Sequence, residues 1–211
     1  MSVPPSTVAR LAAGLAVLVG FGDTLVALTL ISYLREVGQV HVAAKSAMPT
    51  FLASVAGPAL ALVLAFVSGV IAGSFTGHWA QGRRRQVVLA LVTLLFVVAA
   101  LLNAGASGGL ALLILASAMG ALHGVLEDVP GAFVGLSESI GRLGEKLATT
   151  VAGGVSHGWQ TDLLRWVGIF IGIVTGMILY PLFGLGGIWS AAALAGLLSI
   201  VTEISGSASP R

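Results

Sequence analysis

Two ionisable side chains lie inside long apolar stretches of this sequence. Asp23 lies in the first of these stretches, and His123 lies near the end of the fourth. A charged group at membrane depth is costly, so each residue is a functional-site hypothesis. A neutral imidazole could relay protons, or ligate the metal of a haem or chlorophyll-type pigment. The alternative is structural: a carboxylate that bonds a neighbouring helix or stays wet near the interface, and a histidine with satisfied hydrogen bonds.

Further polar residues gather where apolar stretches are joined. Glu127 and Asp128 are adjacent and could bind a cation, although they also match a helix end before a proline. Glu36 and His41 could line a polar crevice or could be solvated helix ends. We expect three small or polar residues to mark the ends of short polar helices beside a binding site: Gly38, Gln39 and Ser139.

Common catalytic and nucleic-acid-binding patterns are absent from the sequence. It contains no nucleotide-binding glycine loop followed by Lys-Ser/Thr and no His-Glu-x-x-His. Cysteine is absent, which excludes disulfides and cysteine-ligated metals. No basic stripe interleaved with aromatic residues is present. We therefore expect neither an enzyme nor a nucleic-acid-binding protein, and the sequence predicts no cofactor beyond the pigment or haem alternative at His123.

Composition indicates an integral membrane protein whose first partner is the lipid bilayer. The 211 residues are 57% hydrophobic and 9% charged, with a mean hydropathy of +1.04. Soluble domains carry roughly 25% charged residues, so this chain has too little charge to cover a soluble surface. A membrane span needs about 20 apolar residues. Six segments meet that need: 8–34, 51–75, 87–104, 109–126, 164–183 and 185–204.

The chain also shows a weak internal repeat. Residues 66–77 read FVSGVIAGSFTG, and residues 173–184 read IVTGMILYPLFG, about half the chain later. Two segments that join spans, 35–50 and 137–148, each resemble a polar half-helix. The pattern predicts a single all-α membrane domain over residues 1–211, with one repeat at about 8–104 and the other at about 109–204. Three spans per repeat is an odd number, so the two repeats would run in opposite directions through the bilayer.

Glycines recur at helical spacing within the predicted spans. They are typical of helix packing in membranes, where small residues let two backbones approach closely. The packing candidates are Gly69 and Gly73 in the second span, and Gly168, Gly172 and Gly176 in the fifth.

Basic residues predict the orientation. Arg83, Arg84 and Arg85 lie between the second and third spans, and positively charged loops face the cytoplasm. With six spans, both termini fall on that side together with eight of the ten basic residues, which leaves Arg35 and Lys45 outside.

The chain resembles the YoaK-like family, a bacterial six-span inner-membrane family of unknown role. The resemblance rests on the order of five segments: GFGDTLVALTLISYL, FVSGVIAGSFTGHWAQGRRR, AMGALHGVLEDVPG, IGRLGEKLA and GIFIGIVTGMILYPLFGLGGIW. It implies a bacterial inner-membrane location.

The chain departs from that family at three polar elements. Glu36-Val37-Gly38-Gln39 stands where the family has Met-Thr-Gly-Asn, Leu122-His123 where it has Gln-Asn, and Ser139-Ile140 where it has Thr-Gly. The resemblance therefore implies a member that has kept the scaffold and altered or lost the family's activity.

Two functions are compatible with these features. The first is a small secondary transporter or channel-like protein, with its site between the two inverted repeats. The second is a non-catalytic subunit of a larger membrane complex that holds lipid or pigment. A homo-oligomer is compatible with either function.

Overall fold

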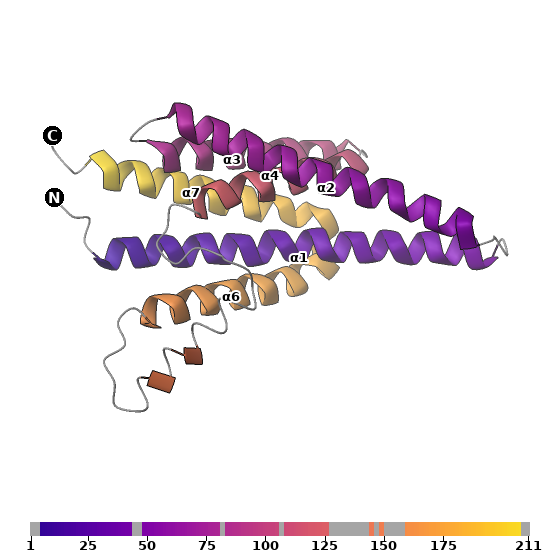
Figure 1. Cartoon of the computed structure of the whole chain (residues 1–211), viewed down its shortest axis with the longest axis horizontal. Coiled ribbons are helices and arrows are strands. Elements are labelled where there is room, and N and C mark those ends of the chain that lie inside the picture. The colour runs from indigo at the N-terminus through magenta and orange to yellow at the C-terminus, as the bar shows by residue number, and fades with distance from the viewer. Residues whose placement is uncertain are drawn as a thin grey trace.

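The computed structural model describes residues 5–43, 48–80, 83–105, 108–126, 144–145, 148–149 and 159–207. Long helices account for most of them, and the 3-10 turn η1 (Gly184–Gly187) joins the last two (Figure 1). The helices are α1 (Pro5–Ala43), α2 (Met48–Trp79), α3 (Arg84–Ala104), α4 (Gly108–Leu126), α6 (Trp159–Phe183) and α7 (Ile188–Ser207). Within these ranges no strand occurs, which confirms the all-α prediction.

The helices are long and apolar, as expected of a membrane protein. Four stretches of the described chain are long and apolar enough to cross a bilayer, and a fifth, Gly108–His123, is apolar but shorter. The four are Ala12–Val40, Met48–Trp79, Arg84–Ala104 and Asp162–Thr202. The last contains α6, η1 and α7, and its chain turns at Gly184, whose φ of 54° is in the left-handed region that favours glycine.

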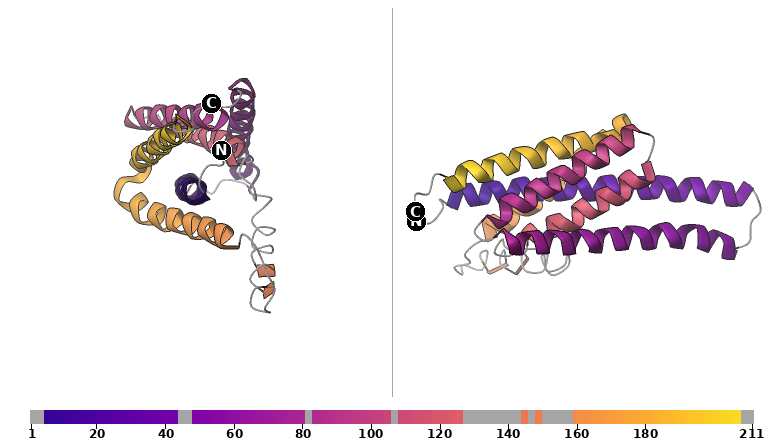
Figure 2. Two further views of the ribbon diagram at one scale, coloured as in Figure 1. Left: turned by 90° about the vertical axis from the view of Figure 1, so that its left-hand side faces the viewer. Right: turned by 90° about the horizontal axis from the view of Figure 1, so that it is seen from above.

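Four helices form the centre of the bundle, and two lie outside it. Fully buried large side chains come from α1, α3, α4 and α7, and Phe96 of α3 is the largest of them. The others are Leu15, Leu18, Leu25, Val88, Leu89, Val92, Leu115, Met119, Leu122 and Ile188. Figure 2 shows α1 between α6 on one side and the group of α3, α4 and α7 on the other. The outer helices α2 and α6 therefore expose most of their large apolar side chains, which suits contact with lipid.

Glycines allow α2 to lie directly against α4. A Cβ added at Gly73 would come 2.7 Å from the carbonyl oxygen of Ala121, and one at Gly69 would clash with the carbonyl of Ser117. The Ser117 hydroxyl also donates a hydrogen bond of 2.9 Å to the carbonyl oxygen of Ala65 on α2. The two glycines therefore let the backbones of α2 and α4 approach closely.

The glycines of α6 likewise allow this helix to lie directly against α1. A Cβ at Gly168 would come 2.8 Å from the carbonyl oxygen of Ala13, and one at Gly172 would clash with the carbonyl of Val17. At Gly176 the nearest atoms belong to Thr24, at 2.9 Å. The pairs α1–α6 and α2–α4 are the two most extensive helix contacts of the described bundle.

The first predicted half-helix is wrong. Residues 35–43 continue α1 without a break, so that α1 has 39 residues and extends past α3 and α4 at the end where α2 begins (Figures 1 and 2). At 1.5 Å per residue this is about 58 Å, roughly twice the thickness of the hydrocarbon core. The segment contains no proline that would end the helix. The second predicted half-helix, 137–148, lies largely outside the described residues.

Candidate functional site

Asp23 lies on an open strip of α1. Gly22 and Thr24 on either side of it are buried, whereas the Asp23 side chain is exposed. Steps of four residues along the helix keep the same face, and the exposed strip continues through Ala27, Ile31 and Arg35. The strip connects Asp23 with the end of the bundle at which α1 extends beyond its neighbours.

The structure brings His123 of α4 to within electrostatic reach of Asp23. The two helices meet at Gly22, where an added Cβ would clash with the sulfur of Met119. Met119 of α4 therefore lies against α1 one residue before the carboxylate. The two ionisable side chains predicted from separate spans thus form one candidate pair in the bundle.

Contacts from two helices hold the imidazole of His123. Its Nδ1 is 3.1 Å from the carbonyl oxygen of Met119, one turn earlier on α4. The ring also packs edge-on against Phe66 of α2, with centroids 5.2 Å apart. With the proton on Nδ1, His123 donates to Met119, and Nε2 remains an acceptor for a proton or a ligand.

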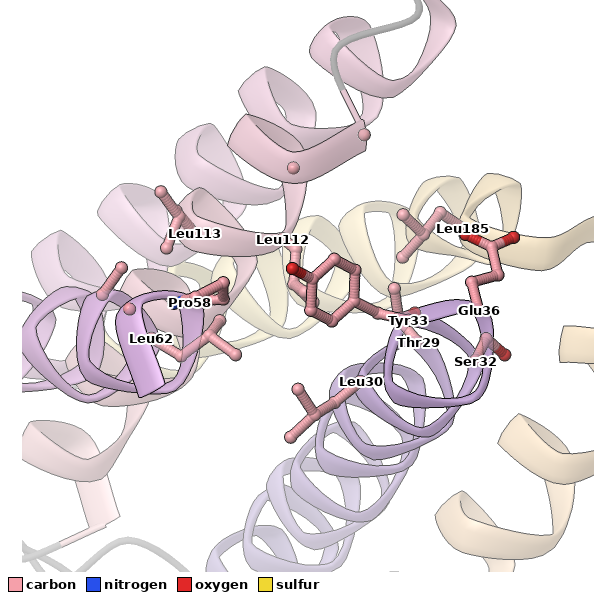
Figure 3. Close-up of a pocket in the computed structure, with 14 residues that line it drawn as sticks. Thr29, Leu30, Ser32, Tyr33, Glu36, Pro58, Leu62, Leu112, Leu113 and Leu185 are labelled. Atoms are coloured by element: carbon pink, nitrogen blue, oxygen red, sulfur yellow. The ribbon is translucent and has the colours of Figure 1, made fainter. Parts of the chain in front are cut away.

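A cleft lies between α1, α2, α4 and η1, further along α1 than Asp23. Its volume is about 620 Å³, and most of the side chains around it are apolar (Figure 3). Thr29, Tyr33 and Glu36 line it from α1, at spacings of four and three residues that place them on one helix face. That spacing can be seen in the sequence, but only the structure shows that α2, α4 and η1 lie beside this face and form a cleft with it.

The hydroxyl groups of the cleft are already hydrogen-bonded. Thr29 donates to the carbonyl oxygen of Leu25 at 2.7 Å, and Tyr33 donates across to the carbonyl oxygen of Ser54 on α2 at 3.3 Å. Ser32 donates to Leu28 and accepts from Tyr180 of α6. These bonds fix the polar edge of the cleft, and Glu36 is the only charged residue among those lining it in the described chain.

The remaining sequence candidates fall in different places. Gly38 and Gln39 lie within α1 rather than at a helix end, and a Cβ at Gly38 would meet nothing within 4 Å. Glu127, Asp128 and Ser139 lie outside the described residues. Within the part of the chain that is described, no three His, Asp or Glu side chains gather as a metal site would require.

Sequence comparison gives the family of the chain. Neither a curated protein nor a solved structure matches it. A family described as proteins of unknown function, DUF1275, matches residues 11–201, which include every helix of the described bundle at least in part. The YoaK-like name is consistent with this family. Because the match covers most of the sequence, the chain belongs to the DUF1275 family.

Proposed function

We propose that this protein is a small transporter-like membrane protein in which Asp23 and His123 form the ion-handling site. The observation that carries the proposal is that Asp23 and His123 lie beside the contact between α1 and α4, among largely apolar helices. Ionisable residues at this depth are typical of proton relays and ion pathways.

The helix pairing supports an arrangement of two inverted repeats. In the sequence repeat α2 corresponds to α6, and α1 corresponds to α4. The glycine row of α6 packs on α1, and that of α2 packs on α4, so corresponding helices make corresponding contacts. In this arrangement the six helices cross the bilayer six times, and the Asp23–His123 pair lies where the two repeats meet, as in many secondary transporters.

The orientation follows from the same arrangement. The beginning of α1, the end of α7 and the α2–α3 connection lie at one end of the bundle (Figure 1). This end carries Arg83, Arg84 and Arg85. The positive-inside rule assigns it to the cytoplasmic side of a bacterial inner membrane.

Proton flux into proteoliposomes tests the proposal. The purified protein is reconstituted with a pH-sensitive dye inside, and a potassium diffusion potential drives protons inward. We expect flux well above that of protein-free vesicles, and a loss of about tenfold or more in Asp23→Asn and in His123→Gln. His78→Gln is the matched control, because His78 is exposed at the end of α2. Wild-type flux no higher than that of empty vesicles, or unchanged flux in both variants, would refute the assignment.

One observation favours the accessory-subunit alternative. The ends of α1 and α2 that extend past the other helices carry exposed apolar residues: Val40 (64%), Val42 (80%), Met48 (68%) and Leu52 (58%). Such a surface is typical of a contact with another membrane protein. The alternative predicts that the native protein purifies in a stoichiometric complex that Val42→Glu dissociates. An isolated native protein of unchanged mass in both forms would exclude it.

A further inference from the structure

We propose that the cleft between α1, α2 and α4 binds a small amphiphilic cation: an apolar body with one ammonium or phosphonium-type centre. The cleft lies well along α1 from Asp23, and this inference goes beyond the proposed ion-handling site. It depends on the size of the cleft, its walls, its aromatic ring and its charge.

The size and the walls fit an apolar body. Small-molecule sites have volumes of roughly 300–1,000 Å³ and mostly apolar linings, and the cleft has about 620 Å³. Pro58 and Leu62 of α2, Leu112 of α4 and Leu185 of η1 supply apolar walls (Figure 3). Because the hydroxyl groups of Thr29 and Tyr33 already donate hydrogen bonds to backbone carbonyls, the cleft offers a ligand few hydrogen bonds. It therefore suits a ligand with few donors and acceptors.

The aromatic ring fits a cation. Tyr33 reaches from α1 toward α2, and its bond to the carbonyl oxygen of Ser54 holds the ring in place (Figure 3). An aromatic face attracts quaternary ammonium and similar ions that cannot donate hydrogen bonds. Holding the ring before binding reduces the entropy that the ligand would otherwise have to offset.

The charge determines the sign of the ligand. Glu36 lies three residues after Tyr33 on the same face of α1, and it is the only charged residue lining the described cleft. A carboxylate beside an apolar wall attracts a cation and repels an anion. A phospholipid head group always carries an anionic phosphate beside any ammonium, so a free organic cation without an anionic group suits the single carboxylate better.

A pair of ions of equal shape and opposite charge tests the inference. Tetraphenylphosphonium and tetraphenylborate are titrated separately into the full-length protein in lipid nanodiscs, and empty nanodiscs correct for partition into lipid. We expect saturable binding of the phosphonium ion at one site per chain, and binding of the borate at least about tenfold weaker. Equal affinity for the two ions, or no saturable binding of the cation, would overturn the proposal.

Glu36→Gln isolates the role of the charge. The amide keeps the size of the side chain, so we expect the affinity for the phosphonium ion to fall about tenfold while that for the borate does not fall. Glu36→Asp should retain the preference for the cation. Unchanged cation affinity in Glu36→Gln would show that the carboxylate does not select the ligand.

Two glycines provide a matched test of the location. Gly57 lines the cleft and Gly38 does not, and a Cβ at either position meets nothing within 4 Å. Because Gly57 precedes Pro58 in α2, the helix content of both leucine variants is compared with that of the wild type before the titration. Gly57→Leu fills the cleft and should abolish saturable binding, whereas Gly38→Leu should bind as the wild type does. Equal binding by both variants would place the cation elsewhere. The binding titration does not measure proton flux. A negative binding result would therefore leave the Asp23–His123 proposal unaffected, and a negative flux result would leave the cation-binding proposal unaffected.

Discussion

Replacing Gly73 with alanine should weaken the α2–α4 contact, whereas the same change at Gly57 should not. Both glycines lie within α2. At Gly73 the new Cβ would be 2.7 Å from the carbonyl oxygen and 2.8 Å from the Cα of Ala121. Ordinary contact begins at 3.4 Å, so the helices must separate by about 0.6–0.7 Å at this level.

The expected loss of stability is the free-energy cost of separating the two helices. Overpacking of this kind destabilises by about 1–3 kcal/mol. The movement also strains the hydrogen bond from Ser117 to Ala65, one turn of α2 away from the Gly69 contact. At Gly57 a Cβ meets nothing within 4 Å beyond its chain neighbours, and the next residue is Pro58, whose ring disfavours a Cβ on a helical neighbour, so alanine should change the stability little. The two variants should therefore differ by about 1–3 kcal/mol.

Unfolding in mixed micelles measures the difference. Sodium dodecyl sulfate is titrated into the detergent-solubilised protein, and helix content and tryptophan fluorescence are followed to obtain the free energy of unfolding. Gly172→Ala, at the corresponding contact of α6 with α1, should be destabilised in the same way as Gly73→Ala. If Gly73→Ala and Gly57→Ala agree within about 0.5 kcal/mol, close backbone approach does not stabilise this bundle.

Two further predictions use the same unfolding assay. Ser117→Ala removes the bond from α4 to α2 and should cost about 0.6 kcal/mol; Ser68→Ala, whose hydroxyl bonds within α2, should cost less. Gly184→Val places a β-branched residue at a φ of 54° and should cost about 1–2 kcal/mol, whereas Gly184→Asn should cost less. Equal stability within either pair would contradict the reasoning.

The sequence predicted where helices occur better than where they end. Each of the six apolar segments lies mainly within a helix, because an apolar chain in lipid must satisfy its backbone internally. The apolar segment ends at residue 34, but α1 continues for nine more residues. Residues 35–43 are polar enough to leave the hydrocarbon, yet they contain no proline that would end the helix. Hydropathy predicts which residues lie in lipid. A helix, however, continues until its backbone groups find other hydrogen-bond partners.

The candidate site was predictable only as separate residues. Asp23 and His123 stand out in the sequence as ionisable groups among apolar neighbours. That they approach each other depends on the packing of α1 on α4 at Gly22 and Met119, which no local pattern specifies. The cleft beside Glu36 depends in the same way on helices that are distant in the sequence.

The way the glycine rows pack limits how a transporter of this kind could move. If each sequence repeat packed mainly within itself, the two repeats could rock as separate rigid bodies. Here Gly172 packs α6 against α1, and Gly73 packs α2 against α4, so each close pair takes one helix from each of the two proposed repeats. Contacts between backbones this close have little room to slide. The units that could move are therefore the α1–α6 pair and the α2–α4 pair. Asp23 and His123 lie on different units, so such a movement would change the distance between them.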